Sequence, residues 1–160
     1  MSTENKMITI KGCIDSNEQL HGKIEMFRED QTLYKTSHYN HGLLNGRCNM
    51  FDDKGFMCTE VKYFKNNEAD GRNTKYFSHF IENKRSVREI RIYTCGIMHT
   101  IDTYEFNGNQ KMHFERQVDG SYSGWMGTEH EGNENSYQLT LMQIEEISKM
   151  DGEVSSAIKE

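Results

Sequence analysis

The chain has 160 residues, a mean hydropathy of −0.87 and a net charge of −6, with 34 % hydrophobic and 28 % charged residues. This length fits a single domain, and no run of 18 apolar residues could form a membrane-spanning helix. The acidic balance argues against a general attraction to nucleic acid or to anionic lipid, so neither partner is expected. Eight Phe, eight Tyr and one Trp indicate a folded chain rather than a disordered one.

The N-terminal residues and the cysteines indicate a cytoplasmic protein. Residues 1–6 are polar and only a short apolar run follows them, so a signal peptide is not expected. Cys13, Cys48, Cys58 and Cys95 form no Cys-x-x-Cys pair, which argues against zinc-ribbon and thioredoxin sites. We expect reduced thiols that pack as small hydrophobes within strands. A disulfide between Cys48 and Cys58 across a hairpin is compatible with the sequence but not required by it.

Glycines recur about every 10 residues, often directly after Asn or Asp. Asn45-Gly46, Asp70-Gly71, Asn107-Gly108 and Asp119-Gly120 are dipeptides that favour type I′ hairpin turns, in which both central residues have positive φ. The glycines that we predict to be structural turn residues are Gly22, Gly46, Gly71 and Gly108. Proline is absent, so no strand loses a backbone donor. The pattern predicts an antiparallel meander.

A repeat of about 24 residues runs through the chain. Residues 22–27, 46–51 and 71–76 share the pattern glycine, basic residue, three variable residues and an aromatic residue. A second aromatic residue follows the glycine by 17 residues in the first two units and by 22 in the third, which places an insertion in residues 78–86. We expect this insertion to form an extended hairpin loop or a longer strand pair. The rings expected to form a ladder on the more buried face are Phe27, Phe51, Tyr76, Tyr39, Tyr63 and Tyr93. A fourth, degenerate unit follows in residues 100–117.

The C-terminal part differs from the repeats. We expect residues 120–127, around Trp125, to form an edge strand or a loop with the Trp packed beneath the following helix, although a ligand-binding loop is an alternative. Apolar residues at helical spacing predict an amphipathic helix over 136–150, with Ser136 as its N-cap. This helix would cover the end of the sheet or serve as a dimerisation or partner helix. The predicted division is therefore a sheet domain over 1–135, the helix, and a disordered tail over 151–160.

Two segments carry a family resemblance. Residues 39–46 read Tyr-Asn-His-Gly-Leu-Leu-Asn-Gly, and residues 64–71 read Phe-Lys-Asn-Asn-Glu-Ala-Asp-Gly. With the glycines and rings around them, over residues 19–117, they resemble MORN repeats, in the longer variant that is similar to bacterial YwqK-type antitoxins. Asn67, Thr100 and the insertion depart from that pattern. The resemblance implies an all-β meander of hairpin repeats, which the predicted C-terminal helix would cap, and a non-enzymatic scaffold that binds and neutralises a toxin.

The sequence contains no nucleotide-binding or serine-hydrolase motif, so no catalytic residue and no cofactor are predicted. His38 and His41 lie three residues apart on a predicted strand, where they would point to opposite faces, so no metal site is predicted. A small hydrolase that uses His38 or His41 with nearby carboxylates is kept as an alternative.

The predicted interface consists of residues that the ring ladder does not need. If Tyr39 and Tyr63 point into the ladder, their neighbours should point to the opposite, open face, because strand residues alternate. The predicted partner-binding residues are Tyr34, His38, Lys62, Phe64 and Trp125. If the helix instead covers this face, the binding surface would be the other face or a sheet edge.

From these observations we predict a cytoplasmic inhibitor of a partner protein. The acidic chain would attract a basic partner. The alternative within the binding class is a virus-encoded inhibitor of a host defence protein, which would then act in the host cytoplasm. A homodimer through the C-terminal helix or a sheet edge is a further expectation.

Overall fold

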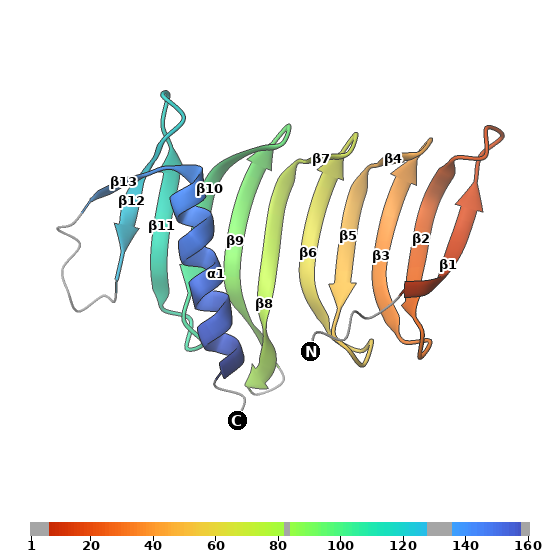
Figure 1. Cartoon of the computed structure of the whole chain (residues 1–160), viewed down its shortest axis with the longest axis horizontal. Coiled ribbons are helices and arrows are strands. Elements are labelled where there is room, and N and C mark those ends of the chain that lie inside the picture. Colours follow the sequence, from red (N-terminus) through yellow and green to blue (C-terminus); the bar gives the residue numbers. More distant parts are fainter. Residues whose placement is uncertain (1–6, 82–83, 128–135, 158–160) are drawn as a thin grey trace.

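The computed structural model describes residues 7–81, 84–127 and 136–157, which form one antiparallel sheet with a helix on one of its faces (Figure 1). The strands are β1 (Met7–Ile14), β2 (Leu20–Arg28), β3 (Leu33–Asn40), β4 (Leu43–Leu44), β5 (Gly46–Phe51), β6 (Cys58–Lys65), β7 (Glu68–Ala69), β8 (Gly71–Ile81), β9 (Lys84–Thr94), β10 (Ile97–Tyr104), β11 (Gln110–Arg116), β12 (Tyr122–Met126) and β13 (Tyr137–Leu139). The strand order follows the chain, with the short β4 and β7 paired only to β3 and β6. The predicted all-β meander with a C-terminal helix is confirmed.

The tight turns lie at other residues than predicted. Positive φ at both central residues occurs at His41-Gly42, Asn66-Asn67 and Cys95-Gly96, which join neighbouring strands. In Asn45-Gly46 and Asp70-Gly71 only the glycines have positive φ, 103° and 105°, and these glycines begin β5 and β8. The prediction of type I′ turns there is wrong, because these dipeptides lie where one strand breaks and the next begins rather than at the hairpin tip. All four glycines that were predicted as turn residues have positive φ, but only Gly108 lies in a turn, between β10 and β11. Gly22 lies within β2, and Gly46 and Gly71 are strand residues, so the turn prediction is wrong for these three.

The insertion in residues 78–86 lengthens a strand pair, as one of the two predicted outcomes. β8 and β9 have 11 residues each, and pairing reaches Ile81 and Lys84.

The cysteines differ from the prediction in part: Cys48 and Cys58 are buried strand residues, whereas Cys13 and Cys95 are exposed, the latter in a turn. All four are free thiols.

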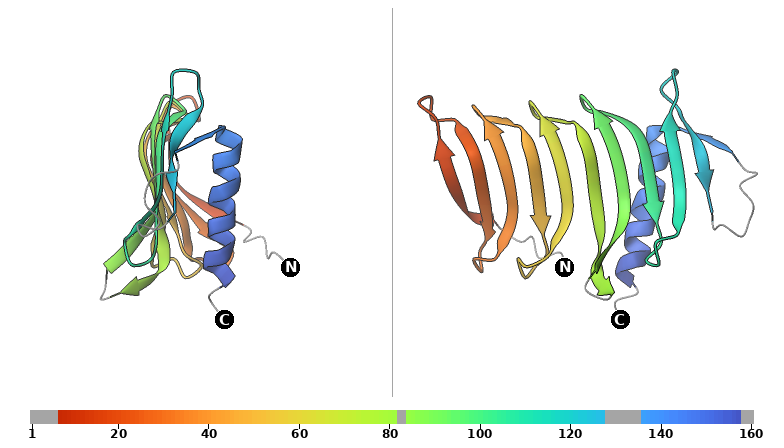
Figure 2. Two further views of the ribbon diagram at one scale, coloured as in Figure 1. Left: turned by 90° about the vertical axis from the view of Figure 1, so that its left-hand side faces the viewer. Right: turned by 180° about the vertical axis from the view of Figure 1, so that it is seen from behind.

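The helix α1 (Leu141–Ala157) packs on one face of the sheet, which we call the front face (Figure 2). Cross-strand partners share a face, so the front face can be followed from strand to strand through the register. Its residues include Ile24 and Ser37 on β2 and β3, Cys48 and Lys62 on β5 and β6, and Arg91, Ile101 and Phe114 on β9 to β11. The opposite side is the back face.

The predicted ring ladder is correct for two rings and wrong for a third. Tyr39 lies opposite Gly22 and Tyr93 lies opposite Gly71, but the residue opposite Gly46 is Phe64. Tyr63 points to the back face and is exposed. The cause is the loop between β5 and β6. There the N–H of Asp52 bonds the carbonyl of Met57, five residues on, whereas the corresponding bond between β2 and β3, from Arg28 to Thr32, spans four. One extra residue reverses the face of every later position in the strand.

The main core lies beneath α1. Met98, Ile101, Met112, Phe114, Tyr122 and Ile144 form its buried cluster. The remaining rings of the predicted ladder, Phe27, Phe51 and Tyr76, each follow a register shift and are only half-buried. These three rings therefore lie outside the buried cluster, which forms where α1, and not a neighbouring repeat unit, covers the sheet.

The helix begins later and ends later than predicted. Gln143 donates its N–H to the Thr140 hydroxyl at 3.2 Å, and the Gln143 side chain accepts the N–H of Thr140 at 2.9 Å. This reciprocal pair is a capping box, so Thr140 is the N-cap and Ser136 is not. Residues 137–139 instead pair with β12, and the helix continues through residues predicted as a tail.

Trp125 lies on the strand β12, which is not the predicted edge strand because β13 pairs with its outer side, and Trp125 faces away from the helix. It pairs with His113 on the back face. Tyr122 takes the position beneath α1, where it is buried and its hydroxyl donates to the carbonyl of Met98 at 2.7 Å. The prediction that the Trp packs under the helix is wrong because it lies an odd number of residues from Tyr122.

Gly124→Ala is expected to cost about 3 kcal/mol of stability, at the upper end for overpacking. A Cβ at Gly124 would lie 1.8 Å from the carbonyl oxygen of His113 and 2.7 Å from the Cα of Phe114. Because both are backbone atoms, β12 must move away from β11. Thermal unfolding measures the loss, with Ser123→Ala as the matched control on the same strand. Equal melting temperatures for the two variants would contradict this β11–β12 register.

Candidate binding surface

The helix covers only part of the front face. Its contacts are with β9 to β12, through the core cluster and through Glu89 and Arg91, whereas the front-face residues of β3, β5, β6 and β8 lie outside those contacts (Figure 1). We call this second region the open half of the front face. Its described residues include Lys35, Tyr39, Met50, Lys62 and Phe64.

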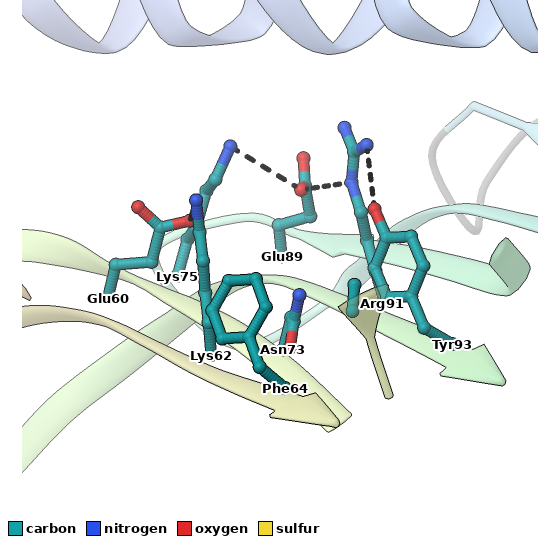
Figure 3. A pocket seen from close by; sticks show the side chains of 9 residues that line it. Glu60, Lys62, Phe64, Asn73, Lys75, Glu89, Arg91 and Tyr93 are labelled. Carbon is teal, nitrogen blue, oxygen red and sulfur yellow. Dashed lines mark hydrogen bonds and ion pairs between the residues drawn. The ribbon is translucent and has the colours of Figure 1, made fainter. Parts of the chain in front are cut away.

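A shallow pocket of about 210 Å³ lies at the border between the open half and the helix. It is lined by Glu60, Lys62, Phe64, Ala69, Asn73, Lys75, Glu89, Arg91 and Tyr93. Figure 3 shows the long side chains rising from the strands toward the level of α1. Three neighbouring strands supply alternate residues to one face, which is why residues more than 30 positions apart meet here.

The wall nearest the helix is a buried ionic network. Glu89, only 4 % exposed, accepts a 2.6 Å bond from Nε of Arg91 and another of 2.6 Å from the hydroxyl of Ser148 on α1. Arg91 also binds both carboxylate oxygens of Glu145 on α1, at 2.5 and 3.2 Å. This bidentate pair is the geometry in which arginine binds carboxylates most strongly. The network therefore fastens the helix to the sheet.

Both buried groups remain charged. Burial by itself would raise the pKa of Glu89, but the charges of Arg91 and Lys75 and the Ser148 hydrogen bond outweigh it and hold that pKa below its usual value. Burial by itself would lower the pKa of Arg91. The hydrogen bond to Glu145 and the charge of Glu89 outweigh burial and hold that pKa above its usual value. These two side chains are thus occupied with each other and with α1.

The pocket also contains two lysine side chains that solvent can reach. The side chains of Lys62 and Lys75 are 35 % and 34 % exposed. Lys62 lies 3.3 Å from Glu60, and Lys75 lies a looser 3.7 Å from Glu89. Phe64 forms a half-buried apolar wall beside them. The pocket thus offers two ammonium groups next to an aromatic ring.

The five predicted partner-binding residues do not form one surface. Lys62 and Phe64 line the pocket on the front face. His38 lies on the back face opposite Lys23, with Nδ1 3.0 Å from the carbonyl of Arg47, and Trp125 also faces back. Tyr34 stacks on the guanidinium of Arg28, with 5.1 Å between the Arg Cζ and the ring centre. The expectation of a shared face fails because of the extra residue in the loop before β6.

Sequence reasoning missed the residues that carry the ionic network. Residues 89–92 alternate charged and branched side chains, a pattern that indicates a strand with its apolar side inward. In the structure Glu89 and Arg91 face the helix and are buried, while Ile90 and Ile92 face back and are half-buried. The alternation correctly indicates a strand, but the charged side of that strand, and not its apolar side, faces the helix.

Two of the described histidines, His41 and His113, contact carboxylates. His41 Nδ1 lies 2.7 Å from Asp15 in an exposed turn, apart from His38. On the back face His113 has Asp102 at 2.6 Å from Nδ1 and Glu115 at 3.3 Å from Nε2, so both ring nitrogens face carboxylates and neither faces a nucleophile. Within residues 7–81, 84–127 and 136–157, no three His, Cys, Asp or Glu side chains are placed to hold a metal ion.

No protein-family model matches the sequence, and no curated protein is similar to it. The MORN resemblance therefore stays a prediction. α1, the helix within the described residues, is not long and apolar enough to cross a membrane.

Proposed function

We propose that this chain is a non-enzymatic protein-binding module that acts in the cytoplasm and inhibits its partner by occupying the partner's surface. The observation that carries the proposal is the open half of the front face, where the ring of Phe64 stands beside the accessible ammonium groups of Lys62 and Lys75. Aromatic side chains next to cations are typical anchors of protein interfaces. Neutralisation of a toxin, as the MORN resemblance implies, is the form of inhibition that we propose.

The shape of the site favours a binder over an enzyme. A pocket of about 210 Å³ is smaller than the roughly 300 to 1,000 Å³ that small-molecule sites usually offer. Its two most buried charged groups, Glu89 and Arg91, are engaged in holding α1 rather than presented to a substrate. A pocket of this size accepts one side chain of a partner. The free thiols agree with a reducing compartment.

The test compares two neighbouring rings on one strand. The wild-type protein is used to capture partners from the native cells, and the captured protein is then measured against Phe64→Ala and Tyr63→Ala. Phe64 lies on the front face and Tyr63 on the back, so the two variants remove a similar ring from opposite sides of β6. We expect Phe64→Ala to weaken binding by more than about tenfold, as the loss of an interface anchor does, and Tyr63→Ala to leave it unchanged.

A second pair checks the charges. Lys62→Glu on the front face should weaken binding, whereas Arg47→Glu on the back face should not. Circular dichroism and thermal unfolding confirm that each variant is folded. Binding that is lost in Tyr63→Ala or Arg47→Glu and kept in the front-face variants would contradict the proposed surface, and turnover of a substrate by the purified chain would contradict the non-enzymatic role.

A further inference from the structure

The sheet already binds one acidic helix, and the contacts of that helix indicate what the rest of the face can bind. α1 places Ile144 in the core and, on the next residue, presents the Glu145 carboxylate to Arg91. An apolar side chain and a carboxylate on one helix flank therefore meet an apolar row and a cation on the sheet. The same combination recurs on the open half, where Lys62 and Lys75 stand beside Phe64.

The spacing of the strands leaves room for a second helix. β6 is two strand positions from β9, and neighbouring strands lie about 4.8 Å apart. Because α1 contacts β9 to β12, a helix above β6 would lie about 10 Å or more from it. Packed helices normally lie about 8 to 10 Å apart, so the sheet has room for a second helix beside α1.

The charge of the open half selects the kind of helix. Among the described side chains of β3 to β8 that face the front, the charged ones are Lys35, Glu60, Lys62 and Lys75. Three lysines against one glutamate make this face of these strands positive, although the chain carries a net charge of −6 and Lys75 also lies 3.7 Å from Glu89 on β9. An acidic segment would be attracted to it, in contrast to the basic partner expected from net charge alone.

We propose that the partner presents an acidic amphipathic helix, which packs beside α1 with a carboxylate between Lys62 and Lys75 and its apolar residues against Phe64. This inference rests on the proposed function and adds the chemistry of the bound segment. The helix extends the layer that α1 begins, so that the front face of β6 to β12 becomes covered by two helices.

The test uses a displayed library of helix-forming peptides in which surface positions carry Glu, Lys or Gln at random. The library is selected in parallel on the wild-type protein and on a Lys62→Glu, Lys75→Glu double variant shown to be folded. We expect the wild type to enrich Glu on one helical flank beside apolar residues, and the double variant to enrich Lys there. A selected acidic peptide should bind the double variant about tenfold or more weakly than the wild type, because like charges replace opposite ones.

Further arms separate the two proposals. Raising the salt concentration should weaken the binding of the acidic peptide, because salt screens the attraction between opposite charges. A central Pro in the peptide should abolish binding by breaking the helix. If peptides depend on Phe64 but show no acidic preference, the acidic helix is wrong and the front-face binding module stands. If Phe64→Ala leaves binding unchanged, both proposals are contradicted. Failure of the library to yield any peptide above background, or full binding by the peptide with Pro, would overturn the helix proposal.

Discussion

Phe114→Ala is expected to lower the free energy of unfolding by about 3 to 5 kcal/mol, which is the cost of removing a fully buried ring. Phe114 has no exposed surface and lies in the cluster that Ile144 of α1 completes. Its loss would leave a cavity between sheet and helix that neither side can close, because both are held in place by the ionic network. Urea-induced unfolding followed by circular dichroism measures the effect.

The matched control is Phe56→Ala. Phe56 lies in the loop between β5 and β6 and is 89 % exposed, so its removal should change stability by no more than about 0.5 kcal/mol. Two Phe to Ala changes in one chain thus have sharply different expected results. Similar losses for both would contradict the location of the core beneath α1.

Arg91→Met is expected to cost about 3 to 5 kcal/mol, because it leaves the buried carboxylate of Glu89 without its closest cation and frees Glu145 from the sheet. Thermal or urea unfolding measures the loss. Lys75→Met is the control: Lys75 is about a third exposed and lies 3.7 Å from the same carboxylate, so the expected cost is below about 1 kcal/mol. A larger effect at Lys75 than at Arg91 would contradict the arrangement of the network.

The same network predicts a response to acid. The pKa of Glu89 in the folded chain is held below its unfolded value, which is near 4.3 for glutamate, so its ionised form favours folding. This contribution is present in full above that unfolded pKa and decreases as the pH falls toward and through the folded pKa. In Glu89→Gln this part of the acid dependence should be missing. A stability profile below pH 5 identical to that of the wild type would contradict it.

Local signals explain how much of the fold can be predicted. Glycine spacing and alternation act over a few residues, so they indicate strands, positive φ and the meander without knowledge of the rest of the chain. They do not show where the hairpin tips lie. The tips contain His41 and Asn66, which have positive φ, whereas in Asn45-Gly46 only the glycine has it. The first helical residue likewise depends on β12, which pairs with residues 137–139 and moves the N-cap to Thr140.

Two of the residues that the sequence indicates as partner-binding candidates line the candidate site. Lys62 and Phe64 were identified as partner-binding candidates, and the structure brings both into the pocket. Glu89 and Arg91 were missed because charged strand residues are normally solvated, and only their pairing with Glu145 and Ser148, more than 50 positions away, makes their burial favourable. Sequence spacing contains no information about such distant partners.

The repeat, the strands and the presence of a C-terminal amphipathic helix follow from the sequence, since each depends on the order of neighbouring residues. Which side of each strand faces inward does not follow, because alternation defines two faces without distinguishing them. One extra residue in the loop before β6 exchanged Tyr63 and Phe64 between the faces. The choice of inner face was made by α1, whose apolar and acidic flank buries one half of that face and leaves the other half open beside it. That choice requires contacts between the helix and strands far from it along the chain, and it also locates the candidate binding surface.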